Sequence, residues 1–463
     1  MQLHKGRPTR ANSSEVVLSS GIDGSRLGDS TVVASGASAE LDRAISRARR
    51  RLVPFLLLMY VVSFLDRANI GFAKQALQTS AGISASAYAL GAGLFFLSYA
   101  LLEVPSNLVL HRVGAKVWMS RIMVSWGLVS MATIFVTGPT SFYLLRLLLG
   151  AAEAGFFPGV VLYLTYWFPN RSRGQILGMF YFGAPLAFIF GGPVSGLLLQ
   201  MRPLFGLQNW QWMFLTEGLL AVVVGIWAYW YLGDKPTGAT WLSAAEKSAL
   251  VEELSWEENE RRSHGPIALL PMFRDLRMMH FVSIYFLIQM SVYGVVFYLP
   301  TEVAAILHRP AGLEVGLVTA IPWLCALAAT FWLPRLADRW NKHRQLAALT
   351  LLVSGCASLA FPTSGPATAL VALSIAASGF IAAQPLFWTF PTGYLVGSAA
   401  AGGIALINAL GAVGGFLAPN AKVWADARFG SPNAGLYLLA GLTLLNAGLI
   451  AGMRFHRAST VKR

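Results

Sequence analysis

Four charged side chains lie within long apolar segments of the sequence: Asp66, Arg67, Arg146 and Glu153. A charge near the centre of a bilayer costs on the order of 3 kcal/mol, so each needs a partner or a function. Arg146 and Glu153 are about two helical turns apart and should lie on the same side of one helix. Arginines offer fixed positive charge to an anion, whereas carboxyls can alternate between ionised and neutral forms. We therefore expect Arg67 and Arg146 to bind an anionic substrate, and Asp66 and Glu153 to exchange protons.

A purely structural role is the alternative for these charges. The two adjacent residues of the first segment, or Arg146 and Glu153, could be static ion pairs that hold helices together. Neighbouring residues on a helix do not face each other, which weakens the first of these pairs. Two more acids, Glu103 and Glu217, lie near the ends of apolar segments, and for them we expect a structural role.

The second half of the chain has neutral hydrogen-bonding groups in its apolar segments where the first half has charges. They are Gln289, Tyr293, Tyr298, Gln384, Trp388, Thr389 and Asn408. Any one tyrosine or tryptophan among them is as readily explained by packing as by ligand contact. Asn408, inside a glycine-rich segment, is the strongest candidate for substrate binding. This distribution predicts carboxylate and proton binding in the first half and hydroxyl recognition in the second.

The composition defines the elements that must position these residues. Of the 463 residues, 56% are hydrophobic and 12% are charged, against about 25% charged in a soluble domain. Mean hydropathy is +0.58. At about 20 residues per membrane span, the chain has room for twelve spans. We expect an all-α membrane protein in which twelve transmembrane helices form two six-helix bundles.

The apolar runs predict a domain order that follows from this architecture. A disordered cytoplasmic tail (1–46) precedes an N-terminal bundle (47–232), a cytoplasmic linker (233–277), a C-terminal bundle (278–455) and a second tail (456–463). The linker contains Ser243 and Glu246 in a capping-box pattern, which predicts an amphipathic helix. The spans are expected at 51–74, 87–110, 116–136, 142–168, 174–200, 211–232, 278–305, 313–336, 345–362, 367–391, 398–420 and 434–454.

Basic residues are concentrated in alternate connections between the apolar runs. The net charge of +14 is therefore not the basic face of a nucleic-acid binder, and it follows the positive-inside rule, with both termini in the cytoplasm. The two cysteines, Cys325 and Cys356, lie in apolar runs and indicate neither a disulfide framework nor a metal site. We expect no cofactor and no nucleic-acid partner, and we expect a monomer in the bacterial inner membrane.

Two short basic loops occupy equivalent places in the two halves. Arg112 and Gly114 follow the second span, and Asp338 and Arg339 follow the eighth. Such loops can act as cytoplasmic gates between rocking bundles. The acid of the second copy, Asp338, is replaced by His111 in the first. Determination of membrane topology is an equally good explanation of these loops, and both remain open.

Four sequence runs resemble signatures of the anion:cation symporter branch of the major facilitator superfamily. They are LDRANIGFA (65–73), EVPSNL (103–108), GAAEAGFFPG (150–159) and WQWMFLTEG (210–218). The resemblance extends from about residue 45 to 455. Within the branch the chain is similar to the bacterial rhamnonate permeases, through NIGFAKQ (69–75), AYALGAG (87–93), TAIPW (319–323), QPLFWT (384–389) and GAVGGFLAP (411–419).

This resemblance implies proton-coupled import of a sugar acid such as L-rhamnonate by alternating access. The matching positions imply proton coupling at Asp66 and Glu153 and carboxylate binding at Arg67 and Arg146. They also imply substrate contacts at Tyr99, Trp388 and Asn408. The chain departs from some sugar-acid relatives at Phe64 and at Ala184-Pro185.

The departures leave tartrate, galactonate, phthalate and 4-hydroxyphenylacetate as alternative substrates. A drug–proton antiporter is less favoured, because buried arginines repel cationic drugs. A transporter-like sensor would need an output domain, for which both tails are short. The absence of a metal cluster, a nucleophile–base pair or a phosphate loop from the sequence argues against an enzyme.

Overall fold

In the computed structural model, residues 24–203, 205–262, 274–394 and 398–453 are described, and their regular secondary structure is helical. Twelve candidate spans within these residues are long and apolar enough to cross a membrane. The prediction of an all-α protein with twelve spanning helices is confirmed. Residues 1–23, 263–273 and 454–463 of the expected tails and linker lie outside the described residues.

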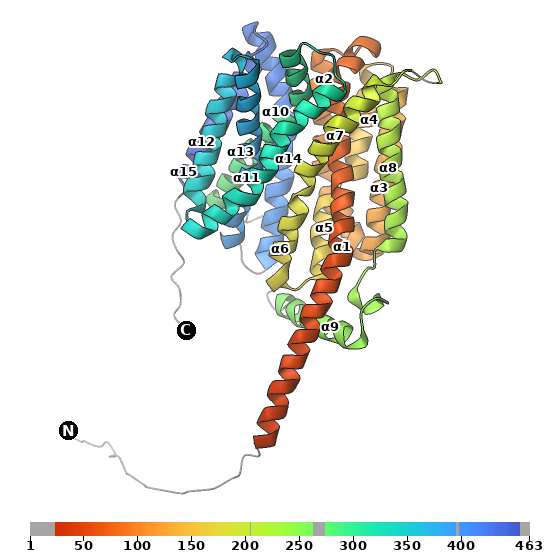
Figure 1. The fold of residues 1–463 in the computed structure, drawn as a ribbon, viewed down its shortest axis with the longest axis vertical. Coiled ribbons are helices and arrows are strands. Elements are labelled where there is room, and N and C mark those ends of the chain that lie inside the picture. Colours follow the sequence, from red (N-terminus) through yellow and green to blue (C-terminus); the bar gives the residue numbers. More distant parts are fainter. Residues whose placement is uncertain (1–23, 204, 263–273, 395–397, 454–463) are drawn as a thin grey trace, which may run out of the picture.

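The spans of the first bundle are formed by α1 to α8, and those of the second by α10 to α15 (Figure 1). The helices of the first bundle are α1 (Gly24–Ser80), α2 (Ala85–Val113), α3 (Ala115–Met131), α4 (Pro139–Glu153), α5 (Phe156–Trp167), α6 (Asn170–Tyr181), α7 (Gly183–Gln200) and α8 (Asn209–Tyr231). After the linker helix α9 (Ala244–Arg262) come α10 (Leu276–Leu307), α11 (Leu313–Trp340), α12 (His343–Ala360), α13 (Pro366–Tyr394), α14 (Ser398–Phe429) and α15 (Ala434–Ala451). Among the described residues, short 3-10 helices include η1 (Ala132–Phe135), η2 (Pro236–Gly238) and η4 (Phe361–Thr363).

The fourth span is interrupted at a position that matters for the site. Helix α4 ends at Glu153, and α5 begins after Gly155, whose φ of +87° is accessible to glycine at little strain. A side chain at Gly155 would also collide with Ser106 of α2. The Ser106 hydroxyl donates to the Ala154 carbonyl oxygen at 2.7 Å, which satisfies a backbone group that the interrupted helix leaves free. The interruption places Glu153 at the end of a helix rather than in its middle.

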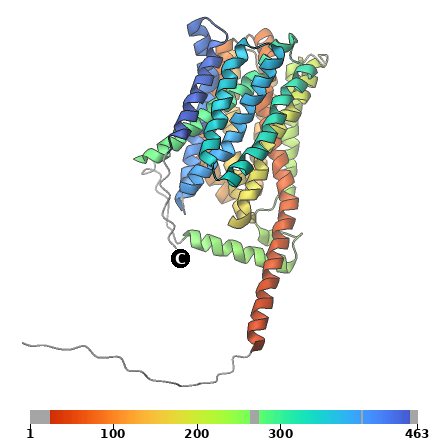
Figure 2. The same ribbon diagram turned by 60° about the vertical axis from the view of Figure 1, so that its left-hand side comes forward.

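The linker helix α9 lies across one end of the first bundle (Figure 2), and we call that end the α9 side and the opposite end the far side. Its start has the expected capping box: Glu246 accepts from the Ser243 backbone N–H at 2.9 Å, and Ser243 accepts from that of Glu246 at 3.2 Å. At its other end Glu257 accepts from the backbone N–H of Asn170 at 2.6 Å and from Arg173 at 3.2 Å. Glu257 thus attaches the linker helix to the start of α6.

The first helix is longer than the sequence analysis expects. It begins at Gly24, so residues 24–46, expected in a disordered tail, are helical. Alanine and arginine, which are abundant before the first span, favour helix. Ala44 and Ala48 are fully buried, and Arg47 binds Glu246 of α9 at 2.9 Å. The ion pair with Glu246 thus attaches the extended part of α1 to the linker helix at Arg47.

The two bundles meet closely on the far side through glycines. Between α7 and α11, a Cβ added to Gly192 would lie 2.7 Å from the Gly316 carbonyl oxygen, and one added to Gly316 would collide with that of Gly192. Between α2 and α14, a Cβ on Gly93 would lie 2.7 Å from the Phe416 carbonyl oxygen. Small residues let helix backbones approach in this way. The far side is closed by backbone packing.

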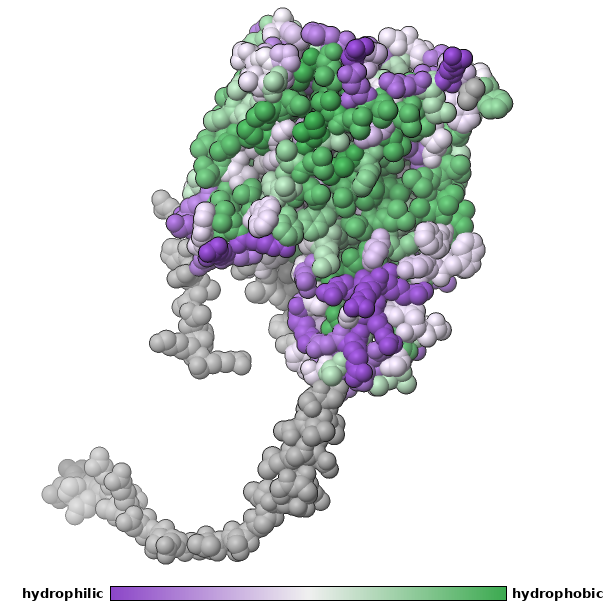
Figure 3. All heavy atoms as spheres, viewed as in Figure 1, coloured by the Kyte–Doolittle hydropathy of each residue, from purple (hydrophilic) through white to green (hydrophobic). Residues whose placement is uncertain are grey.

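The outer surface between the two ends is apolar, as Figure 3 shows for one face. Large hydrophobic side chains such as Leu101, Phe135 and Trp230 are each about 70% exposed (69%, 71% and 71%). Exposed apolar surface of this extent would be unfavourable in water. This apolar outer surface is the one expected to face lipid.

We predict that Gly316→Ala separates α7 from α11 on the far side, because the added methyl group collides with the backbone of Gly192. Spin labels on the far-side ends of these two helices should move apart, as measured by pulsed electron resonance. Gly441→Ala is the matched control, since a Cβ there meets nothing within 4 Å. Equal label distances in both variants and in the unchanged protein would contradict the prediction.

Candidate functional site

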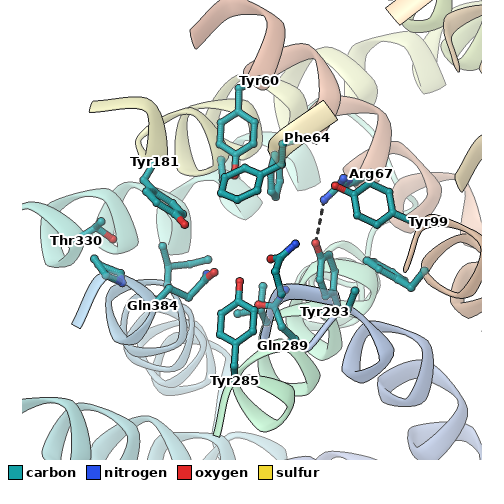
Figure 4. Close-up of a pocket in the computed structure, with 18 residues that line it drawn as sticks. Tyr60, Phe64, Arg67, Tyr99, Tyr181, Tyr285, Gln289, Tyr293, Thr330 and Gln384 are labelled. Atoms are coloured by element: carbon teal, nitrogen blue, oxygen red, sulfur yellow. Dashed lines mark hydrogen bonds between the residues drawn. The ribbon is translucent and has the colours of Figure 1, made fainter. Parts of the chain in front are cut away.

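A cavity between the two bundles is surrounded by eighteen side chains, ten of which are labelled in Figure 4. The first bundle contributes Tyr60, Phe64, Arg67, Phe96, Tyr99, Phe157, Tyr181 and Ala184. The second contributes Tyr285, Gln289, Val292, Tyr293, Thr330, Ile381, Gln384, Pro385, Asn408 and Ala412. Among these lining residues Arg67 carries the charge. The wall combines one cation with aromatic rings and neutral polar groups.

Arg67 is held in place from both bundles. Its Nε donates to Glu153 Oε1 at 3.0 Å and its Nη2 to the same oxygen at 2.5 Å, while Nη1 donates to the Tyr293 hydroxyl at 3.1 Å. The guanidinium lies 5.0 Å from the ring of Phe64 and 5.3 Å from that of Tyr99, within cation–π range. Glu153 is fully buried. The cavity cation is thus already neutralised by an internal acid.

Neither ion pair of the structural alternative is present. Glu153 binds Arg67, and no ion pair within 4 Å joins Arg146 to Glu153 or Asp66 to Arg67 among the described residues. Arg146 is absent from the cavity wall; its guanidinium lies 5.0 Å from the ring of Phe95, behind Arg67. The end of α4 turns Glu153 toward α1. Arg146 and Glu153 therefore do not form an ion pair with each other, although they are two helical turns apart.

Asp66 is buried inside the first bundle, away from the cavity wall. Its Oδ1 accepts a hydrogen bond from Ser130 of α3 and one from Asn69 at 3.4 Å. Its Oδ2 has no hydrogen-bond partner, and neither has Arg146 Nε. The two charges act on each other electrostatically. Asp66 and Arg146 therefore interact electrostatically behind the cavity wall, without an ion pair within 4 Å.

Glu103 has a contact that the sequence analysis missed. It is 2% exposed, and its Oε1 accepts from Asn408 Nδ2 of the second bundle at 2.7 Å. Asn408 and Tyr99, which precedes Glu103 by one helical turn, both line the cavity. The signal available in the sequence was this spacing from Tyr99. Glu103 thus links the two bundles through a hydrogen bond, and the structural role expected for it stays a prediction.

Trp388 does not line the cavity, although the family resemblance implied a substrate contact there. Its ring lies 4.9 Å from that of Tyr285, which does form part of the wall. Gln289 and Gln384, noted in the sequence for their polar side chains, also lie on the wall, as do Tyr60, Tyr181 and Thr330. These last three were missed because no pattern distinguishes them from core residues of the same helices.

The two basic loops lie on the α9 side and differ in structure. Gly114 has a φ of +99°, and Asp234, after α8, accepts from the Lys116 backbone N–H at 2.8 Å. Asp234 thus supplies an acid where His111 replaces the one expected in the first copy. In the second loop Asp338 contacts His343 at 2.8 Å. Arg112 and Arg339 are exposed, and a gating role for both loops stays a prediction.

We predict that Arg67→Met destabilises the fold by about 3–5 kcal/mol, because it leaves the Glu153 charge buried and unpaired. Adding Glu153→Gln should recover most of that loss, since the charge is then absent. Thermal unfolding in detergent would measure both. Arg309→Met is a suitable control, because its pair with Glu314 is long, at 3.7 Å, and exposed. Equal destabilisation in the single and double variants would contradict the prediction, because it would show that the unpaired Glu153 charge does not cause the loss of stability.

Comparison with known proteins assigns this chain to a family. The family model described as Major Facilitator Superfamily matches residues 56–419. The chain is 45% identical over 421 residues to the inner membrane transport protein RhmT of Escherichia coli, covering 91% of this chain and 97% of that protein. It is 40% identical over 409 residues to a putative tartrate transporter of Agrobacterium vitis, covering 88% and 90%.

Solved structures show the same fold at much lower identity. The inward-open xylose transporter XylE from Escherichia coli aligns with a TM-score of 0.70 at 13% identity, covering 87% of this chain and 95% of that one. The chain is therefore a member of the major facilitator superfamily, a multi-pass membrane transporter, as its sequence signatures had indicated.

Proposed function

We propose that this protein is a proton-coupled symporter that imports an organic anion, a sugar acid such as L-rhamnonate, by alternating access. The observation that carries the proposal is the position of Arg67. It is the cation of the cavity wall, and its guanidinium is occupied by Glu153. A substrate carboxylate and the Glu153 carboxylate compete for the same group.

Proton binding to Glu153 resolves this competition. A neutral Glu153 no longer holds the guanidinium as an ion pair, so Arg67 can receive the substrate carboxylate with its charge still compensated. When substrate leaves, Glu153 releases its proton and pairs with Arg67 again. Both the empty and the loaded carrier then have balanced charges in the buried site, and an unbalanced charge would be expensive to move. Proton and anion travel together for this reason.

Asp66 and Arg146 form a second proton-dependent pair behind the first. Arg146 lies behind the wall, so we assign it to Asp66 in this conformation and assign direct carboxylate binding to Arg67. The Asp66 and Arg146 side chains each keep an unused hydrogen-bonding atom. A rearrangement of the bundle can bring the two together or separate them.

The second bundle is suited to hydroxyl groups. Gln289 has a buried Oε1 without a hydrogen-bond partner, and Gln384 and Thr330 lie on the same wall. Neutral amides and hydroxyls recognise a polyhydroxylated chain without adding charge. Aromatic rings on the opposite wall, among them Tyr60, can pack against the face of a sugar acid. This arrangement favours a hydroxylated monocarboxylate, and similarity to RhmT supports the same class.

Two positions leave other anions open as substrates. Phe64 and Ala184, where the sequence departs from some sugar-acid relatives, both line the cavity. Their apolar side chains reduce the number of hydrogen-bonding groups that the first bundle presents to the cavity. Tartrate, galactonate, phthalate and 4-hydroxyphenylacetate are therefore the alternatives, and a relative is a putative tartrate transporter.

We assign the α9 side to the cytoplasm of a bacterial cell. Basic residues gather in the connections on that side, among them Arg112, Arg173 and Arg339, which fits the positive-inside rule. With this assignment, the glycine contacts close the side of the molecule that faces away from the cytoplasm. Opening of the far side requires α7 and α11 to separate.

Glu153→Gln should retain counterflow exchange of labelled substrate in proteoliposomes but lose accumulation driven by a proton gradient. The glutamine is permanently neutral, so Arg67 stays available to substrate while no proton is carried. Glu314→Gln, at an exposed acid on the far side, serves as control and should accumulate normally. Full proton-driven accumulation by Glu153→Gln would rule out Glu153 as the coupling site.

Proton uptake should accompany only some of a panel of acids. Proteoliposomes loaded with a pH dye would receive L-rhamnonate, D-galactonate, tartrate, phthalate and 4-hydroxyphenylacetate in turn. Acidification with a sugar acid alone is the expected result. A response to the aromatic acids alone would preserve the mechanism and replace the substrate. Silence across the panel with folded protein would contradict proton coupling itself.

A further inference from the structure

The first bundle contains more buried acids than buried bases. Its spans bury two arginines, Arg67 and Arg146, and four acids, Asp66, Glu103, Glu153 and Glu217. Arg67 compensates Glu153 and Arg146 faces Asp66. Within the described residues no ion pair reaches either of the two remaining acids. An unpaired charge buried in this way costs several kcal/mol, so the remaining two are expected to hold protons.

Glu217 on α8 is the one of these two that lies outside the substrate route. It is 4% exposed, and its Oε1 accepts from the Ser195 hydroxyl of α7 at 2.7 Å. Its Oε2 has no hydrogen-bond partner. The side chain of Asn69 on α1 interacts electrostatically with this carboxyl, although no hydrogen bond joins the two side chains in this structure. Asn69 Oδ1 is likewise a buried acceptor without a donor.

A single proton satisfies both of these free acceptors. A proton on Glu217 Oε2 can be donated to Asn69 Oδ1, which turns two buried unsatisfied oxygens into one hydrogen bond. The amide of Asn69 is then fixed with its Nδ2 toward Asp66, where it donates to Oδ1 at 3.4 Å. With that proton in place, hydrogen bonds would run from Glu217 through Asn69 to Asp66.

We propose that Glu217 is a constantly protonated positioning residue that orients Asn69 toward Asp66 and thereby sets the pH range in which Asp66 exchanges its proton. This part of the proposal rests on the proton coupling proposed above. The helices packed against α8 are α1, α3 and α7, with η1. On these helices Asp66 is the titratable group that interacts electrostatically with Glu217. Arg146 on α4 interacts electrostatically with Asp66.

The protonation state of Glu217 can be measured without transport. Infrared spectra of the purified full-length protein in lipid membranes at pH 7 should contain the C=O stretch of a protonated carboxyl that Glu217→Gln removes. Ser195→Ala should shift that band, because it removes the donor to Oε1. Loss of a carboxylate band in Glu217→Gln, in place of the protonated one, would overturn the proposal even if the protein proved not to be a symporter.

The positioning role is tested by the pH profile of uptake. Glu217→Gln keeps an acceptor for Ser195 and a donor for Asn69, so the profile should be unchanged. Glu217→Leu has neither and should shift the profile to higher pH by about one unit, because ionised Asp66 loses an oriented donor. Asn69→Ala should produce the same shift, and the double variant no further one. Loss of proton-driven accumulation in Glu217→Gln, or an unchanged profile in Glu217→Leu, would overturn the role.

Discussion

The ion pair between Arg67 and Glu153 is the interaction on which the rest of the site depends. A guanidinium facing a cavity inside the membrane region needs a counter-charge, and Glu153 supplies it from a helix end that exists because α4 stops before Gly155. At the interruption the Ser106 hydroxyl donates a hydrogen bond to the free carbonyl oxygen of Ala154. Three helices, α1, α2 and α4, are therefore positioned by the demands of a single buried charge.

The two bundles are joined by contacts of two different kinds. On the far side the helix backbones are in contact at Gly192 and Gly316. Contacts this close are either fully formed or lost when the helices separate. Around the cavity the joints are single hydrogen bonds, from Arg67 to Tyr293 and from Asn408 to Glu103. A neutral hydrogen bond contributes about 1 kcal/mol net and one from a charged group about 1.5–3 kcal/mol, so these contacts can break and form again if the bundles move. In the proposed mechanism close packing provides two discrete states, and the hydrogen bonds around the cavity let protons and substrate shift the balance between them.

In the mechanism that we propose, the unequal numbers of buried acids and bases let the first bundle respond to protons at more than one carboxyl. Acids with a basic partner, Glu153 and Asp66, can lose a proton without leaving a charge uncompensated. Glu217 has no such partner and is better suited to hold its proton and to orient a neighbour. The same residue type thus takes two roles, and the position of the arginines decides which.

The sequence alone determined the class of the protein, because helix length and apolar composition are local properties of the chain. It located twelve spans, the capping box at Ser243 and the four central charges, Asp66, Arg67, Arg146 and Glu153. Which charge meets which was beyond it, since Arg67 and Glu153 lie on different helices whose rotation depends on packing.

The tertiary structure decided the remaining features for the same reason. In the folded protein Arg146 and Trp388 lie outside the cavity wall. Hydrogen bonds join Glu103 to Asn408 and Asp234 to Lys116, which are far apart in the sequence. An ion pair attaches the extended part of α1 to α9. Periodicity gives the face of one helix, whereas a binding site is made where the faces of several helices meet.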